Sequence, residues 1–73
     1  MDYFGLKCFV EVVRSGSFSK AADKLFRSQP AVSIQLKNLE KELKQPLIDR
    51  YKKKIRLTEA GKILYLGALS SFS

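Results

Sequence analysis

The stretch Ser28-Gln29-Pro30-Ala31-Val32-Ser33-Ile34-Gln35-Leu36-Lys37-Asn38-Leu39-Glu40-Lys41-Glu42-Leu43 decides the fold of this 73-residue chain. It predicts a helix with Ser28 as its N-cap, because a serine hydroxyl accepts hydrogen bonds from the unpaired backbone N–H groups of a first turn. Pro30 suits the same turn, where a missing N–H breaks no hydrogen bond. The apolar residues recur at i, i+4, i+7 and i+11, which predicts one buried face: Val32, Leu36, Leu39 and Leu43.

The opposite face of this helix has two interpretations. It is either a solvated surface with one stray apolar residue, or a surface that enters the DNA major groove. In the second interpretation the amide of Gln29 pairs with an adenine edge, and Ile34 contacts a thymine methyl group. Ser33 serves a base or a phosphate, and Lys37 and Lys41 serve phosphates.

Size and charge restrict the class of protein. A chain of 73 residues forms one domain at most. It carries 14 Lys and Arg against 7 Asp and Glu, a net charge of +7, which favours a polyanionic partner such as nucleic acid or an anionic membrane surface.

The chain has no His and a single cysteine, Cys8, which excludes zinc fingers and disulfide frameworks. We expect Cys8 to act as a small hydrophobic residue rather than a reactive thiol, and we expect no cofactor. The lone thiol, the absence of a recognisable signal peptide and the lack of a membrane-length apolar run indicate a cytoplasmic location.

Residues 2–14 predict a first helix with two apolar lines. One line is Leu6, Phe9, Val10 and Val13. The other line, which a second helix should cover, is Phe4, Cys8 and Val12. We expect this second line to pack against the last helix, in the same chain or in a partner.

Gly16 is expected to end the first helix in the left-handed conformation. Ser19 then caps a short helix over residues 20–26, and a brief turn leads to the helix from Ser28. Residues 19–43 therefore predict a helix-turn-helix, in which the second helix enters the major groove. A generic helical hairpin is the alternative.

Pro46 stops the long helix. The runs 47–51 and 55–57 flank three lysines and predict a small hairpin. Residues 44–56 hold six basic residues and one acidic residue, so phosphate contact is expected of this hairpin. The expected contacts are Arg50, Lys52, Lys53 and Lys54.

Thr58 is expected to cap a last helix that is apolar nearly all round, which usually marks an interface. The residues expected at this interface are Leu64, Tyr65, Ala68, Leu69 and Phe72, together with Phe4, Cys8 and Val12. No pair of carboxylates and no nucleophile–base set is evident, so catalysis is not expected.

Four segments together resemble the N-terminal domain of LysR-type transcriptional regulators. They are Ser17-Phe18-Ser19-Lys20-Ala21-Ala22, Ser28-Gln29-Pro30-Ala31-Val32-Ser33, Leu39-Glu40, and Arg56-Leu57-Thr58-Glu59-Ala60-Gly61. The resemblance covers nearly the whole chain without a gap, and the combination of the second and fourth segments is highly specific.

The resemblance implies a mainly α, winged helix-turn-helix fold, with a three-helix core, a β-hairpin wing over residues 47–57 and a C-terminal linker helix. It implies a DNA-binding domain at 1–57, the start of a dimerising linker at 58–73, and an effector-binding domain that this chain lacks. Base-contacting positions of the family fall on Gln29, Pro30, Ser33 and Ile34, and a backbone-contacting position falls on Lys53.

The implied function is sequence-specific binding of a double-stranded operator in bacterial transcription, by a homodimer that meets a small effector only through the missing domain. The chain departs from the family pattern in three places. Ile34 replaces a frequent Arg, the wing tip carries lysines, and Lys44 stands where Gly usually ends the recognition helix. Either Lys44 adopts a left-handed conformation, or the helix ends differently.

Two other functions compete with this one. The first is a basic module that binds RNA or bulk DNA without sequence choice. The second is a membrane-surface or protein-interaction module, which the apolar last helix allows. Against it, the lysine cluster lies on a hairpin rather than along an amphipathic helix.

Overall fold

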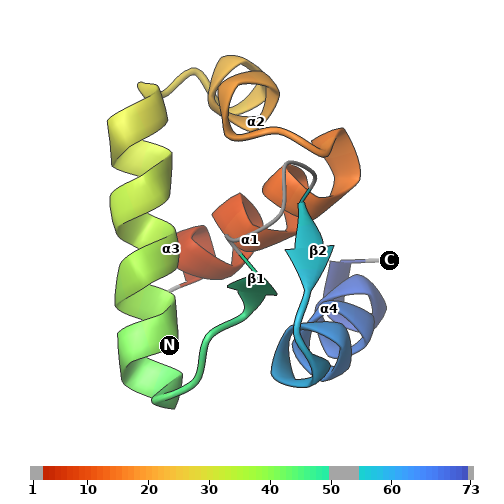
Figure 1. The fold of residues 1–73 in the computed structure, drawn as a ribbon. Helices are drawn as coiled ribbons and strands as arrows, with labels where there is room; N and C mark the ends of the chain where they lie inside the picture. The colour runs from red at the N-terminus through yellow and green to blue at the C-terminus, as the bar shows by residue number, and fades with distance from the viewer. Residues whose placement is uncertain (1–2, 50–54, 73) are drawn as a thin grey trace.

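The computed structural model describes residues 3–49 and 55–72, and the side chains of 3–49 and 55–70. Four helices and a two-stranded antiparallel sheet make up this described part (Figure 1). In chain order these elements are α1 (Tyr3–Ser15), α2 (Phe18–Leu25), α3 (Gln29–Leu43), β1 (Ile48–Asp49), β2 (Arg56–Leu57) and α4 (Glu59–Phe72). The predicted mainly α fold with a small hairpin and a last helix is confirmed.

The junction between α1 and α2 is shorter than expected. Gly16 has φ 69°, and its N–H donates to the carbonyl of Val12, so it ends α1 as predicted. The N-cap of α2 is Ser17, not Ser19, and its hydroxyl accepts from the N–H of Lys20 at 3.3 Å. The prediction was wrong by two residues because the sharp turn at Gly16 places Ser17 directly at the start of α2. The helix ends at Leu25, and Phe26 follows in the left-handed conformation.

Helix α3 begins and ends on local signals. Ser28 is its N-cap, with the hydroxyl oxygen accepting from the N–H of Ala31 at 3.2 Å, and Pro30 lies in the first turn. Lys44 ends the helix with φ 55° and ψ 33°, and its N–H donates to the carbonyl oxygens of Glu40 and Lys41. Of the two endings left open by the sequence, the left-handed one is therefore observed, at a cost that glycine would avoid.

The hairpin is confirmed in its described part. Ile48 pairs with Leu57 and Asp49 pairs with Arg56, in antiparallel register. Leu47, the first residue of the run 47–51, precedes β1 and is completely buried. Tyr51 and the lysine tip lie outside the described residues.

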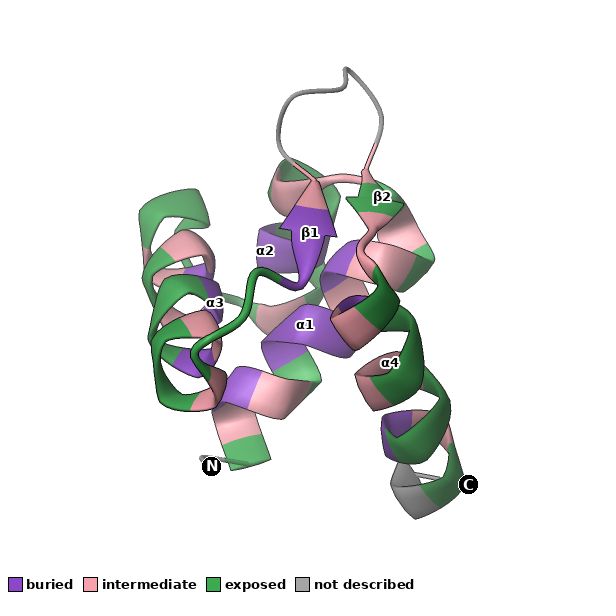
Figure 2. Ribbon diagram, turned by 60° about the horizontal axis from the view of Figure 1, so that its bottom comes forward, coloured by how far each residue is buried: buried purple, intermediate pink, exposed green. Residues whose placement is uncertain are grey.

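One core holds these elements together. The buried stripe of α3 consists of Val32, Leu36 and Leu39, as predicted, while Leu43 is only half-buried. Purple segments in Figure 2 mark the buried residues, which occur on all four helices and on β1. The remaining fully packed members are Cys8, Phe9, Val12, Ala21, Ala22, Leu47 and Ile48. Cys8 is buried among apolar side chains, as predicted for a hydrophobic role.

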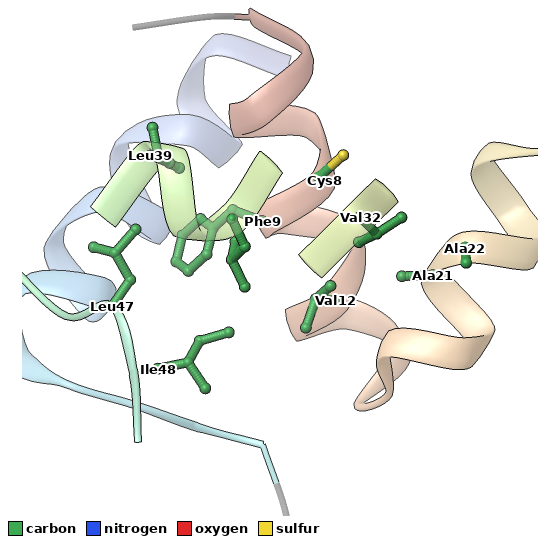
Figure 3. Packing of buried hydrophobic residues seen from close by; sticks show 10 residues of the cluster. Cys8, Phe9, Val12, Ala21, Ala22, Val32, Leu39, Leu47 and Ile48 are labelled. Atoms are coloured by element: carbon green, nitrogen blue, oxygen red, sulfur yellow. The ribbon is translucent and has the colours of Figure 1, made fainter. Parts of the chain in front are cut away.

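The two apolar lines of α1 contact different parts of the chain. Arg27, in the turn between α2 and α3, places its guanidinium over the ring of Phe4. The Cζ atom of Arg27 is 5.0 Å from the centroid of that ring. In Figure 3, Val12 lies on the side of the core toward Ala21 and Val32. Helix α4 contacts α1 at Phe9, whose ring makes an edge-to-face contact with Tyr65 at 6.3 Å. The packing of the Phe4–Cys8–Val12 line on α4 stays a prediction, because periodicity identifies apolar faces but not their partners.

Candidate nucleic-acid interface

Helix α3 presents its outer face along one edge of the molecule. Figure 1 shows its packing partners on one side only, and Figure 2 shows exposed residues along the other. This arrangement follows from the sequence, since the apolar residues of α3 lie on one face and its polar residues on the other. Fifteen residues give α3 a length of about 22 Å, long enough to lie in a DNA major groove.

The start of α3 carries the polar groups that were predicted to read bases. Gln29 and Pro30 are exposed, and Ser33 is half-buried. Ser28 is exposed and already uses its hydroxyl oxygen as the helix cap, which leaves its O–H free to donate. The first turn of a helix also offers unpaired N–H groups and a positive dipole end, both of which attract phosphate.

Ile34 is 57% exposed, although it is a large apolar side chain. Lys37 and Lys41 are exposed on the same face of the helix. The predicted set on α3 is thus brought together on one continuous surface.

An open groove of about 590 Å³ extends this surface toward the hairpin. Its walls include Ile34, Lys37 and Lys41 from the predicted set. They also include Asn38, Lys44 and Gln45, which the sequence analysis did not propose. Asn38 had a signal in the sequence, because positions 34, 37, 38 and 41 follow the spacing of a single helical face, whereas Lys44 and Gln45 lie beyond the end of α3.

The basic residues predicted at the hairpin are Arg50, Lys52, Lys53 and Lys54, and they lie outside the described residues. The strands on either side of them are described, and Arg56 on β2 is exposed. A further basic group that sequence reasoning missed is Arg27, just before α3. Its guanidinium donates to the carbonyl of Phe26 at 3.3 Å and lies over the ring of Phe4, which fixes it beside the helix start.

Helix α4 turns part of its apolar surface inward. Ala68 is 2% exposed, and Leu64, Tyr65 and Leu69 are half-buried. The most exposed apolar side chains on the helix are Ile63 and Leu66, which the sequence analysis had not placed at an interface. The side chain of Phe72 lies outside the described residues. Cys8 and Val12 are completely buried within the chain, so neither is accessible to a partner.

The described residues contain no cluster of three or more His, Cys, Asp or Glu side chains that could hold a metal ion. Among the helices of residues 3–15, 18–25, 29–43 and 59–72, none has both the length and the hydropathy needed to cross a bilayer.

Known structures share this geometry. The crystal structure of the BenM_DBD/catB site 1 DNA complex matches with a TM-score of 0.94 and 40% identity, covering 99% of this chain and 81% of that one. The CbnR_DBD–DNA complex matches with a TM-score of 0.90 and 33% identity, covering 99% of this chain and 83% of that one.

Sequence relatives agree with the structural ones. A probable RuBisCO transcriptional regulator of Cyanidioschyzon merolae is 52% identical over 60 residues, which are 82% of this chain and 20% of the relative. The HTH-type transcriptional regulator CysL of Bacillus subtilis is 49% identical over 65 residues, which are 89% of this chain and 22% of CysL. The chain thus spans about a fifth of the length of these curated relatives.

The model of the bacterial regulatory helix-turn-helix proteins of the lysR family matches residues 5–62, a range that runs from α1 through α3 and the hairpin into α4. Since this match takes in most of the chain, the protein belongs to the lysR family of bacterial regulatory helix-turn-helix proteins.

Proposed function

We propose that this chain binds double-stranded DNA in a sequence-specific manner and acts as the DNA-binding part of a transcriptional regulator. The observation that carries the proposal is the outer face of α3, where Gln29, Ile34 and two lysines are exposed together on a helix held from behind by the core. The BenM_DBD and CbnR_DBD structures, which are complexes with DNA, support it by their likeness to this fold.

The proposed contacts divide into two groups. Gln29, Pro30, Ser33 and Ile34 contact base edges, since an amide suits adenine and an aliphatic group suits the thymine methyl. The second group neutralises phosphates and positions the chain on the duplex. It consists of Ser28, Lys37, Lys41, Arg50, Lys52, Lys53 and Lys54.

We divide the chain into a DNA-binding part and a dimerising part. Residues 1–57 form the winged helix-turn-helix, and residues 58–73 begin a linker helix that joins two copies into a homodimer. The exposed Ile63 and Leu66 support a role of α4 in that dimer, because apolar side chains on a helix favour contact with another apolar surface. A small effector then acts through a separate domain, and the regulator works on the nucleoid by binding rather than by catalysis.

Selection of duplexes from a random library tests the proposal. We expect the bound pool to converge on one motif, with two-fold symmetry if the chain dimerises. Competition titrations at several salt concentrations should then show that the selected duplex outcompetes a scrambled one. Equal affinity for both duplexes at every salt concentration would favour the alternative, a basic module without sequence choice.

A further inference from the structure

The segment Pro46–Leu47 is the point where α3, the hairpin and α4 meet. It follows the C-terminus of α3 and leads directly into β1. Leu47 is completely buried, so its backbone polar groups require partners inside the protein. Those partners come from α3 and from the residue that immediately precedes α4.

Helix α3 supplies the first partner through Glu40. One carboxylate oxygen, Oε2, accepts from the N–H of Leu47 at 2.7 Å and from the N–H of Ile48 at 3.4 Å. Ile48 is the first residue of β1, and Glu40 itself is half-buried. A carboxylate that accepts two backbone hydrogen bonds holds its partners more firmly than a neutral acceptor. Glu40 therefore ties the first residue of the hairpin to the helix that carries the proposed base-reading residues.

The start of α4 supplies the second set of partners. The hydroxyl of Thr58 donates to the carbonyl oxygen of Pro46 at 2.7 Å, and the N–H of Thr58 donates to the carbonyl oxygen of Leu47 at 3.1 Å. The two carbonyls of the segment are thus held by residue 58, and the N–H of Leu47 is held by Glu40. Without Glu40, the hairpin would remain attached to α4 but would lose this polar link to α3.

We infer that Glu40 is a positioning residue for DNA binding, which sets the hairpin at a fixed angle to α3 so that both elements meet one duplex together. This inference rests on the proposed function. Two contact elements held in the bound geometry need no ordering when the complex forms, and they therefore bind more tightly than two elements that move independently.

If Glu40 only stabilises the fold, its loss should change the melting temperature and not the way the folded chain contacts DNA. Loss of its two hydrogen bonds would lower the melting temperature, but the folded fraction would still contact DNA at the same phosphates with the same salt dependence. The two roles are separated by measuring DNA binding at a temperature where every variant is fully folded.

Three substitutions at one position provide the test. Glu40→Asp keeps the charge but shortens the side chain by one methylene, which removes the carboxylate from both N–H groups. Glu40→Ala removes the acceptor altogether. Glu40→Gln keeps a weaker, neutral acceptor oxygen at the original length, so it should bind more tightly than Glu40→Asp and Glu40→Ala. Glu42→Asp, two positions along on the exposed side of α3, is the matched control.

The readouts are affinity for the selected duplex across a salt series, ethylation interference at individual phosphates, and the affinity penalty of a single base change. We expect Glu40→Asp and Glu40→Ala to weaken binding about three- to tenfold, because the hairpin is no longer held against α3 and must be ordered when the complex forms. Their plots of log K against log salt should flatten by roughly 0.9 for each phosphate that the hairpin no longer neutralises. Interference should disappear at the phosphates that flank the base-contacted region, while the base-change penalty, which reports on α3, stays unchanged.

Each outcome decides the matter. Wild-type salt dependence and interference in Glu40→Asp, with or without a lower melting temperature, would overturn the inference. An equal loss of affinity in Glu40→Gln would also overturn it, because the charge rather than the hydrogen-bonded position would then be responsible. If Glu40→Ala does not fold, the comparison of Glu40→Asp with Glu40→Gln still tests the inference. If the wild-type chain prefers no duplex, the proposed function itself has failed, which is a separate result.

Discussion

Ile34 is the residue that separates a solvated helix face from a reading face. More than half of its side chain is exposed, opposite the stripe of Val32, Leu36 and Leu39 that anchors α3 in the core. Single exposed apolar residues are common on proteins and need no special reason. Here Ile34 lines the same groove as Lys37, and the base contact that we propose for it is a thymine methyl group.

Replacing Gln29 tests base reading at this scale. We expect Gln29→Ala to cost about 1–3 kcal/mol on the selected duplex, because the bidentate amide–adenine pair can no longer form, and to leave binding to random DNA nearly unchanged. Ile34→Ala should have a smaller effect, confined to duplexes with thymine at the contacted position. Competition titrations on matched and single-base-changed duplexes at one salt concentration provide the measurement.

Gln35→Ala is the matched control, because it removes the same amide from the half-buried side of the same helix. It should leave the base preference intact. An equal weakening on specific and random DNA for Gln29→Ala would mean that Gln29 only positions the helix.

At the scale of elements, the decisive contact is the approach of α4 to the segment before β1. A Cβ atom at Gly61 would overlap the carbonyl oxygen of Leu47 and would lie 3.1 Å from the carbonyl carbon. Both are backbone atoms, which cannot swing aside as a flexible side chain could. Gly61 therefore permits the close packing in which Thr58 bonds to Pro46 and Leu47. This junction gives a physical reason for Thr58 and Gly61 in the run Leu57-Thr58-Glu59-Ala60-Gly61.

Two alanine substitutions in the same helix test this packing. Gly61→Ala should destabilise the fold by about 1–3 kcal/mol, because the added methyl group forces the backbone apart. Gly67→Ala should instead stabilise it by about 0.5–1 kcal/mol, since no atom lies within 4 Å of the new Cβ and alanine is the better helix former. Chemical denaturation of both variants gives the free energies of unfolding, and a neutral Gly61→Ala would contradict the packing described.

For the molecule as a whole, charge and shape act together. A net charge of +7 on 73 residues attracts any polyanion, but only a fixed arrangement of contacts selects one sequence. The core fixes α3 against α1 and α2, while α4 closes the other side through Tyr65 and Phe9. We therefore expect some basic side chains to attract DNA of any sequence and others to contact particular phosphates.

The triple substitution of Lys52, Lys53 and Lys54 by Ala separates these two contributions. We expect it to weaken binding to all duplexes alike and to flatten log K against log salt by roughly 0.9 for each phosphate that is no longer neutralised. The control replaces Lys7, Lys24 and Lys62, three exposed lysines on α1, α2 and α4, and removes the same charge. Similar slopes for the two variants would show that the hairpin lysines make no defined contact.

The sequence by itself determined the features that depend on neighbouring residues. Ser28 and Pro30 start α3, Gly16 ends α1, and the spacing of Val32, Leu36 and Leu39 marks the buried face. It also determined which polar residues share the outer face of α3. These features follow from hydrogen bonds and periodicity within three or four residues, and such effects are present in the chain before it folds.

The tertiary structure alone decided which surfaces meet. The sequence does not reveal that the ring of Phe9 packs on Tyr65, that Ser17 rather than Ser19 caps α2, or that Glu40 bonds to Leu47. It left the ending at Lys44 open, and the fold places that residue in the left-handed conformation. The physical reason is that several faces of similar apolar character compete for partners, and the competition is settled by the shape and packing of segments far apart in the chain.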